Sequence, residues 1–151
     1  MYATSVPLVI TSLGFLIPSY VAYFQQNYLT SAAYGFLSTT STLVHTTKEP
    51  FHIYGPGNCN AFLLFLDIFA VALCGIRIAI DGWTAGSIAF AIALLVILFT
   101  NVIFYVGQYY ETLVYDRRIE VSLPSHLTVH IVGIVGTLIV LWMREAALKN
   151  G

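Results

Sequence analysis

Long runs of apolar residues, separated by short polar stretches, set the pattern of this chain. A helix needs about 20 mostly apolar residues to cross the hydrocarbon layer of a membrane. Five stretches reach or approach that length, and we expect spans at about residues 5–24, 29–47, 59–80, 85–106 and 125–142. The pattern therefore predicts an all-α, polytopic transmembrane helix bundle of about five spans, with residues 1–151 forming a single transmembrane domain.

The first span carries two features of its own. Pro18 lies inside it and should kink the helix, because proline lacks a backbone N–H and its ring clashes with the preceding turn. Tyr20, Tyr23 and Tyr28 surround its end. Tyrosines gather at membrane–water interfaces, so we expect these three rings to mark one surface of the membrane.

The second and fourth spans differ in polarity, which predicts different surroundings. The second is rich in hydroxyl side chains and should be buried among other helices. Those hydroxyls belong to Thr30, Ser31, Ser38, Thr39, Thr40, Ser41 and Thr42. The fourth span is the most uniformly apolar and the best candidate for contact with lipid. Residues 81–83 are expected to form the turn before it, and residues 108–124 the longest polar connection.

Composition supports a membrane location. The chain is 58% hydrophobic and only 9% charged, whereas a soluble domain carries about 25% charged residues. The net charge of -1 argues against a nucleic-acid partner. The expected partners are membrane lipids and other membrane subunits that complete the bundle. An endomembrane or the plasma membrane is favoured over an organelle inner membrane. The Lys and Arg residues are divided equally between the two sides of the membrane, so they leave the orientation of the chain open.

Three histidines supply the first candidate chemistry. His126 and His130 lie four residues apart at the start of the last span, so both imidazoles share one helix face and offer two ligands for zinc. His45 ends the second span. Because the second span ends and the fifth begins at the same membrane surface, we expect all three imidazoles at one depth.

Two further polar residues belong to the same region. Ser41 lies one helical turn from His45, on the same face. Asp67 lies about 12 Å below the same surface, counted from the start of the third span. An aspartate at the centre of a membrane helix costs about 2.5–3.5 kcal/mol, so we expect it to have a partner or a task.

Together these residues can perform metal-assisted hydrolysis. Zinc held by three neutral imidazoles keeps one position open for water and lowers the pKa of that water to about 7. A carboxylate nearby can act as general base, and a hydroxyl can stabilise a developing oxyanion. We therefore predict His45, His126 and His130 as zinc ligands and Asp67 and Ser41 as catalytic residues, with a lipid amide or ester as substrate.

The same residues carry a family resemblance. Residues 41–45 form an S-x3-H pattern, Asp67 is a lone aspartate on the following span, and residues 126–130 form H-x3-H. This order resembles the CREST superfamily of membrane proteins, which includes alkaline ceramidases, adiponectin-type receptors, lipid-remodelling proteins and myomaker. Residues 41–67 look most similar to the myomaker branch.

The resemblance implies zinc bound by His45, His126 and His130, with supporting roles for Ser41 and Asp67. The family has seven spans, so this chain would be a shortened, five-span form. Either a partner subunit replaces the two missing helices, or the site is a relic of an active one.

Two other functions stay open. The chain can be a non-catalytic structural subunit of a larger membrane protein complex, because its loops are short. It can also hold haem b between His45 and one of the other histidines, although Asp67 is a poor neighbour for an apolar macrocycle. Each residue also has a purely structural interpretation: the histidines bond water or headgroups, Asp67 pairs with a histidine, and Ser41 bonds a backbone carbonyl.

Overall fold

The computed structural model describes residues 6–46, 59–115 and 119–150, and within these ranges the chain is helical with no strand. The prediction of an all-α helix bundle is therefore confirmed. The helices are α1 (Val6–Gly14), α2 (Leu16–Phe24), α3 (Tyr28–Thr46), α4 (Cys59–Ala85), α5 (Ser87–Tyr110) and α6 (Ile119–Asn150). A short 3-10 helix, η1 (Leu113–Tyr115), precedes α6.

Within the described residues, four helical stretches are long and apolar enough to cross a membrane. They are Val6–Phe24, which joins α1 and α2, and Phe62–Ala85, Ser87–Gly107 and Glu120–Asn150. These stretches indicate an integral membrane protein. The stretch in α5 is the least buried of the four, in agreement with the expected lipid contact.

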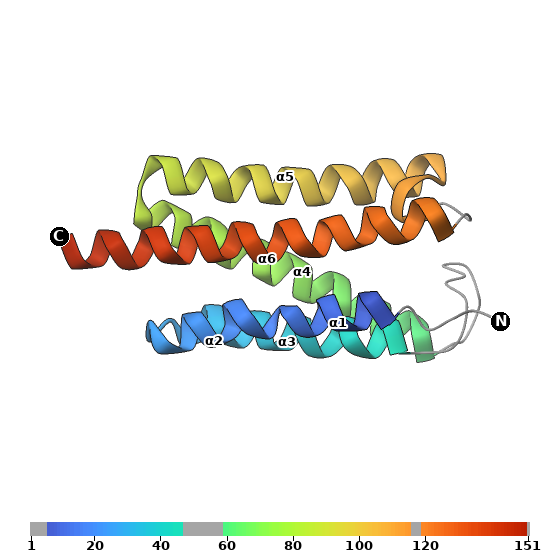
Figure 1. Cartoon of the computed structure of the whole chain (residues 1–151), viewed down its shortest axis with the longest axis horizontal. Helices are drawn as coiled ribbons and strands as arrows, with labels where there is room; N and C mark the ends of the chain where they lie inside the picture. The colour runs from blue at the N-terminus through green and yellow to red at the C-terminus, as the bar shows by residue number, and fades with distance from the viewer. Residues whose placement is uncertain (1–5, 47–58, 116–118, 151) are drawn as a thin grey trace.

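The helices run side by side along the long axis of the molecule (Figure 1). α1 and α2 lie along α3, α4 crosses the bundle diagonally, and α5 and α6 form the other side. α1 begins at one end of the bundle and α6 ends at the other (Figure 1). This placement agrees with an odd number of passes along the bundle.

α3 lies inside the bundle, as its hydroxyl content predicted. It packs against α1, α2 and α4, and Thr30, Ser38, Thr40 and Ser41 are buried. Hydroxyls thus link helices where lipid would offer no hydrogen-bond partner. α3 is less apolar than the four candidate spans and is not among them.

The first span is broken, as Pro18 predicted. α1 ends at Gly14 and α2 begins at Leu16. The break lies one turn before Pro18 because the proline ring displaces the carbonyl four residues earlier, that of Gly14. The backbone N–H of Phe15 bonds instead to the carbonyl of Ser12, at 3.2 Å. α1 and α2 are therefore two helical segments separated by one residue, Phe15.

Two expected connections were wrong. Residues 81–83 lie within α4, and the chain turns at Gly86, whose φ of 114° favours glycine. Asp-Gly is a turn signal, but here Gly82 allows a close approach of α5: a Cβ on it would lie 2.9 Å from the carbonyl oxygen of Ala89.

The polar connection over residues 108–124 is also shorter than expected. α5 continues to Tyr110 and α6 already begins at Ile119, so Pro124 lies inside α6. One proline removes a single backbone hydrogen bond, which a helix can lose without ending. His126 and His130 consequently lie about two to three turns into α6 rather than at its start.

Candidate metal centre

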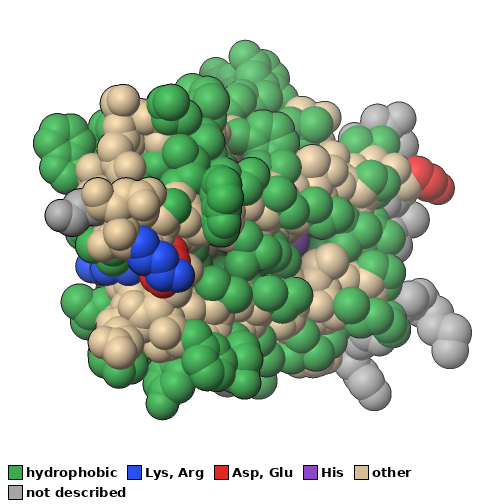
Figure 2. Space-filling model, turned by 60° about the vertical axis from the view of Figure 1, so that its left-hand side comes forward, with side chains coloured by type: hydrophobic (Ala, Val, Ile, Leu, Met, Phe, Trp, Pro, Cys, Tyr) green, Lys and Arg blue, Asp and Glu red, His purple; other side chains and the backbone are tan. Residues whose placement is uncertain are grey.

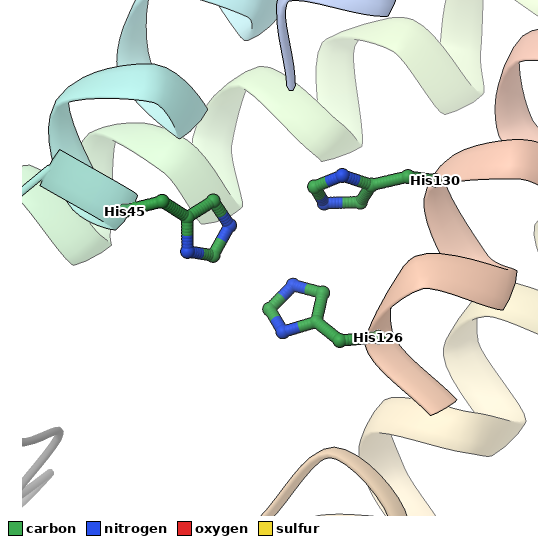
Figure 3. A group of neighbouring side chains, drawn as sticks. All are labelled: His45, His126 and His130. Carbon is green, nitrogen blue, oxygen red and sulfur yellow. The ribbon is translucent and has the colours of Figure 1, made fainter. Parts of the chain in front are cut away.

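Three imidazoles meet where α3 ends beside α6. His45 comes from the last turn of α3, and His126 and His130 come from successive turns of α6. Their side chains point toward one another (Figure 3), and one ring nitrogen from each lies within 4.8 Å of the others. The ring centroids are 4.8 Å apart for His45 and His126 and 4.9 Å for His126 and His130.

This donor set fits a metal ion. In a tetrahedral zinc site with Zn–N bonds of about 2.0–2.1 Å, ligand nitrogens lie about 3.3 Å apart, so the distances between the three nitrogens need to shorten by up to about 1.5 Å. His45 and His130 are buried. The Nε2 atom of His45 is buried and has no hydrogen-bond partner among the described residues. Such an atom is costly to bury, and coordination would satisfy it.

His130 is held by Thr11, a residue that no pattern in the sequence marks as functional. The Oγ1 of Thr11, on α1, lies 2.9 Å from Nδ1 of His130. The same hydroxyl lies 3.0 Å from the carbonyl of Pro7 and 3.1 Å from that of Leu8. We assign the ring proton to Nδ1, because the hydroxyl can then donate its single proton to one of these carbonyls while its oxygen accepts from Nδ1–H. Nε2 of His130 is then left with a free lone pair for a metal.

Aromatic rings restrain the two histidines of α6. Phe15 packs edge-on against His130 at a centroid distance of 5.2 Å, and Phe104 packs edge-on against His126 at 5.7 Å. Phe15 lies at the break between α1 and α2. The interruption caused by Pro18 therefore helps to shape the centre, because α1 supplies Thr11 and the break supplies Phe15.

A cavity of about 90 Å³ adjoins two of the three histidines, His126 and His130. Its lining includes His126, His130, Asp67 and Ser41, together with mostly apolar side chains from α3, α4, α5 and α6. This volume holds several water-sized molecules. The centre therefore has space beside it for a reacting group.

Asp67 lies on the wall of this cavity, on α4. It is half-buried and accepts a hydrogen bond of 3.1 Å from Oγ1 of Thr40, on α3. Asp67 shares the cavity with His126 and His130, but the structure gives it no direct hydrogen bond to a histidine among the described residues. Its partner is thus a threonine, and a pairing of Asp67 with a histidine is not what is found.

Ser41 is buried on the side of α3 that faces α1. Its Oγ lies 3.0 Å from Oγ of Ser12. Ser12 also bonds the carbonyl of Leu8, and its own carbonyl accepts from Ser38. Ser41 borders the cavity, but its hydroxyl is part of a network that fastens α1 to α3. That network holds Thr11 in position over His130.

The comparisons with known proteins add no relative. No protein-family model, curated protein or solved structure matches this chain.

Proposed function

We propose that this chain is a shortened, CREST-like membrane protein that binds zinc through His45, His126 and His130 and hydrolyses an ester or amide bond of a lipid. One observation carries the proposal: three imidazoles from two helices lie within 4.8 Å of one another beside a cavity. Imidazole is a preferred ligand of zinc, and three of them leave a coordination position for catalysis.

A zinc ion at this place supplies a Lewis acid that activates water and polarises a carbonyl. Residues of the chain orient the zinc ligands and accept the proton of the attacking water. Thr11 keeps His130 in the tautomer that binds metal through Nε2. Asp67 borders the same cavity and takes a proton from the attacking water as general base. Thr40 donates to Asp67 and orients its carboxylate.

The lining of the cavity favours a lipid as substrate. Apart from the site residues, it consists mainly of apolar side chains such as Leu37, Val71, Val96 and Phe104. Pockets of this kind bind apolar groups and use a few polar groups to orient the reacting atom. An ester or amide carbonyl at the head of an acyl chain has this combination of properties.

Hydrolysis of a panel of lipid esters and amides by zinc-loaded protein in detergent micelles tests the proposal. Asp67→Asn should reduce the rate by roughly 10²–10⁴-fold, the usual contribution of a general base, while leaving bound zinc unchanged. Glu145→Gln is the matched control, since this carboxylate lies in a surface pair with Lys149 on α6. Failure of zinc-loaded protein to hydrolyse any lipid in the panel would favour the non-catalytic membrane subunit.

A visible absorption spectrum of the same preparation separates zinc from haem. Bis-histidine haem would give a Soret band, and we expect none. A strong Soret band that is lost when His45 is substituted would show that the site binds haem and would contradict the zinc proposal.

A further inference from the structure

A second polar cluster lies at the opposite end of the bundle from the histidines. Its centre is Asp81, near the end of α4, which is 2% exposed. Asp81 accepts hydrogen bonds from Asn27 Nδ2 at 2.9 Å and from Thr30 Oγ1 at 2.6 Å. Arg77 lies 3.6 Å and Arg144 3.4 Å from the same carboxylate oxygen, Oδ1. Arg144 is about 21 Å along α6 from His130, so this cluster is separate from the candidate metal centre.

The charges of this cluster do not balance. Two guanidinium groups share one carboxylate, which leaves one excess positive charge. The neighbouring acid, Glu145, pairs with Lys149 at 3.0 Å. Arg77 also donates hydrogen bonds to two neutral groups, Thr30 Oγ1 at 3.1 Å and Asn27 Oδ1 at 3.3 Å. A charge held inside a membrane protein is costly without a counter-charge, so the cluster favours an additional anion.

The donor that would meet such an anion is also present. Nη1 of Arg144 is buried and has no hydrogen-bond partner among the described residues, and the same holds for Oε1 of Gln25. The amide of Gln25 donates to the carbonyl of Leu141, less than one turn from Arg144. A water between the two unpartnered atoms would satisfy both hydrogen bonds, but it would leave the charge uncompensated. An anion satisfies the arginine and the charge together.

The depth of the cluster indicates which anion it meets. Exposed aromatic side chains surround this end of the molecule, namely Tyr20, Tyr23, Tyr28, Trp83 and Trp142. Tyrosine and tryptophan mark the membrane–water interface, where the phosphates of lipid headgroups lie. Figure 2 shows basic side chains gathered over acidic ones at this end, surrounded by apolar and uncharged surface. The side chains of Arg77 and Arg144 are each 20% exposed, so a ligand can reach part of each one. The buried Nη1 atom of Arg144 has to turn outward to meet that ligand.

We propose that Arg77 and Arg144, organised by Asp81, form a binding site for one phosphate group, carried by a lipid headgroup at this surface of the membrane. Guanidinium matches phosphate in shape and charge and donates two parallel hydrogen bonds to it. Asp81 fixes the two arginines in place and neutralises only one of them. The site therefore accepts a single negative charge, which is the charge of a phosphodiester.

Lipid retention measured by native mass spectrometry tests the proposal. Detergent-purified protein is offered phosphatidylglycerol or a galactosyl diacylglycerol with the same acyl chains, which lacks phosphate. Wild-type protein should retain the phosphate lipid about tenfold better or more, as expected for charge-assisted hydrogen bonds. Arg144→Gln and Arg77→Gln should abolish this preference. Lys149→Gln removes the same charge from an exposed position at the same end of α6 and should preserve it.

Equal retention of the two lipids by wild-type protein would overturn the proposal, and this comparison needs no variant to fold. A preference that survives in a folded Arg144→Gln variant would also overturn it. Arg144→Lys keeps the charge but loses the planar donor pair, and it should show a reduced preference. Inorganic phosphate at matched ionic strength shows whether the bound phosphate group comes from a lipid headgroup or from free phosphate. If it displaces the lipid and raises the midpoint of thermal unfolding, the site takes free phosphate. If it does neither, the lipid headgroup is the ligand.

Discussion

The hydrogen bond from His130 to Thr11 gives the sharpest test of how the centre is built. Thr11→Val replaces the hydroxyl with a methyl group of similar size and changes little else. The hydroxyl oxygen lies 2.9 Å from Nδ1 of His130, and its proton is engaged by the carbonyls of Pro7 and Leu8. In the variant, Nδ1–H of a histidine that is 5% exposed loses its acceptor.

The size of the effect follows from that geometry. A buried donor without a partner costs about 1–3 kcal/mol. Without metal, the ring of His130 can change tautomer or turn, whereas metal binding through Nε2 requires the proton on Nδ1. The penalty therefore falls on the metal-bound state. Loss of such a supporting hydrogen bond typically weakens metal affinity about 10–100-fold, which corresponds to about 1.4–2.7 kcal/mol.

The assay is competition for zinc against a fluorescent chelator, with protein in detergent micelles. Thr128→Val is the matched control, because Thr128 lies on α6 between the two histidines and is exposed. Among the described residues its hydroxyl bonds only the carbonyl of Pro124. Thr11→Ser keeps the hydroxyl and should bind zinc nearly as well as wild type. A folded Thr11→Val variant with unchanged zinc affinity would refute the reasoning, and so would an equal loss in Thr128→Val.

Three further outcomes are expected. Asp81→Asn should lower the free energy of unfolding by about 2–4 kcal/mol, which is somewhat less than for a fully buried ion pair because both arginines are partly exposed. Chemical denaturation in micelles measures this change. The control Glu145→Gln should lower the free energy of unfolding by less than about 1 kcal/mol. Gly136→Ala should cost about 1–3 kcal/mol because its new Cβ would collide with Val96 of α5, and adding Val96→Ala should recover most of that loss; additive effects would contradict this contact. Zinc affinity should fall as the pH is lowered, since protons compete for the imidazole lone pairs; chelator titrations across pH check it, and a flat profile would argue against histidine ligands.

Hydropathy alone predicted much of the fold, because four stretches are so apolar that burial in protein or lipid is their only stable environment. The hydroxyl-rich helix α3 was also placed correctly inside the bundle. The turn expected at residues 81–83 failed for a physical reason. Asp-Gly is typical of turns, but Asp81 has hydrogen-bond partners in α3 and charged partners in α4 and α6. A local pattern cannot reveal Thr30 and Arg144 as partners, because both lie more than 50 residues from Asp81.

The candidate metal centre was likewise predicted only in part from the sequence. Helical spacing predicted that His126 and His130 share a face, and matching depth predicted that His45 joins them, which the structure places within 4.8 Å. The support for that centre was not predicted. Thr11 is one of several hydroxyl residues in the first span, beside Ser12 and Ser19, and only the packing of α1 against α6 shows that it is the one that reaches His130. Thr40 was one of nine serine and threonine residues on its span, with nothing in the sequence to select it as the partner of Asp67.

We propose that three histidines, His45, His126 and His130, together bind one metal ion. The most direct test is elemental mass spectrometry of detergent-purified protein, with wild type measured beside a His126→Ala/His130→Ala double variant. We predict about one zinc per chain in wild type and its loss in the variant, with both proteins helical by circular dichroism. A well-folded wild-type protein that holds no metal after incubation with zinc would contradict the account.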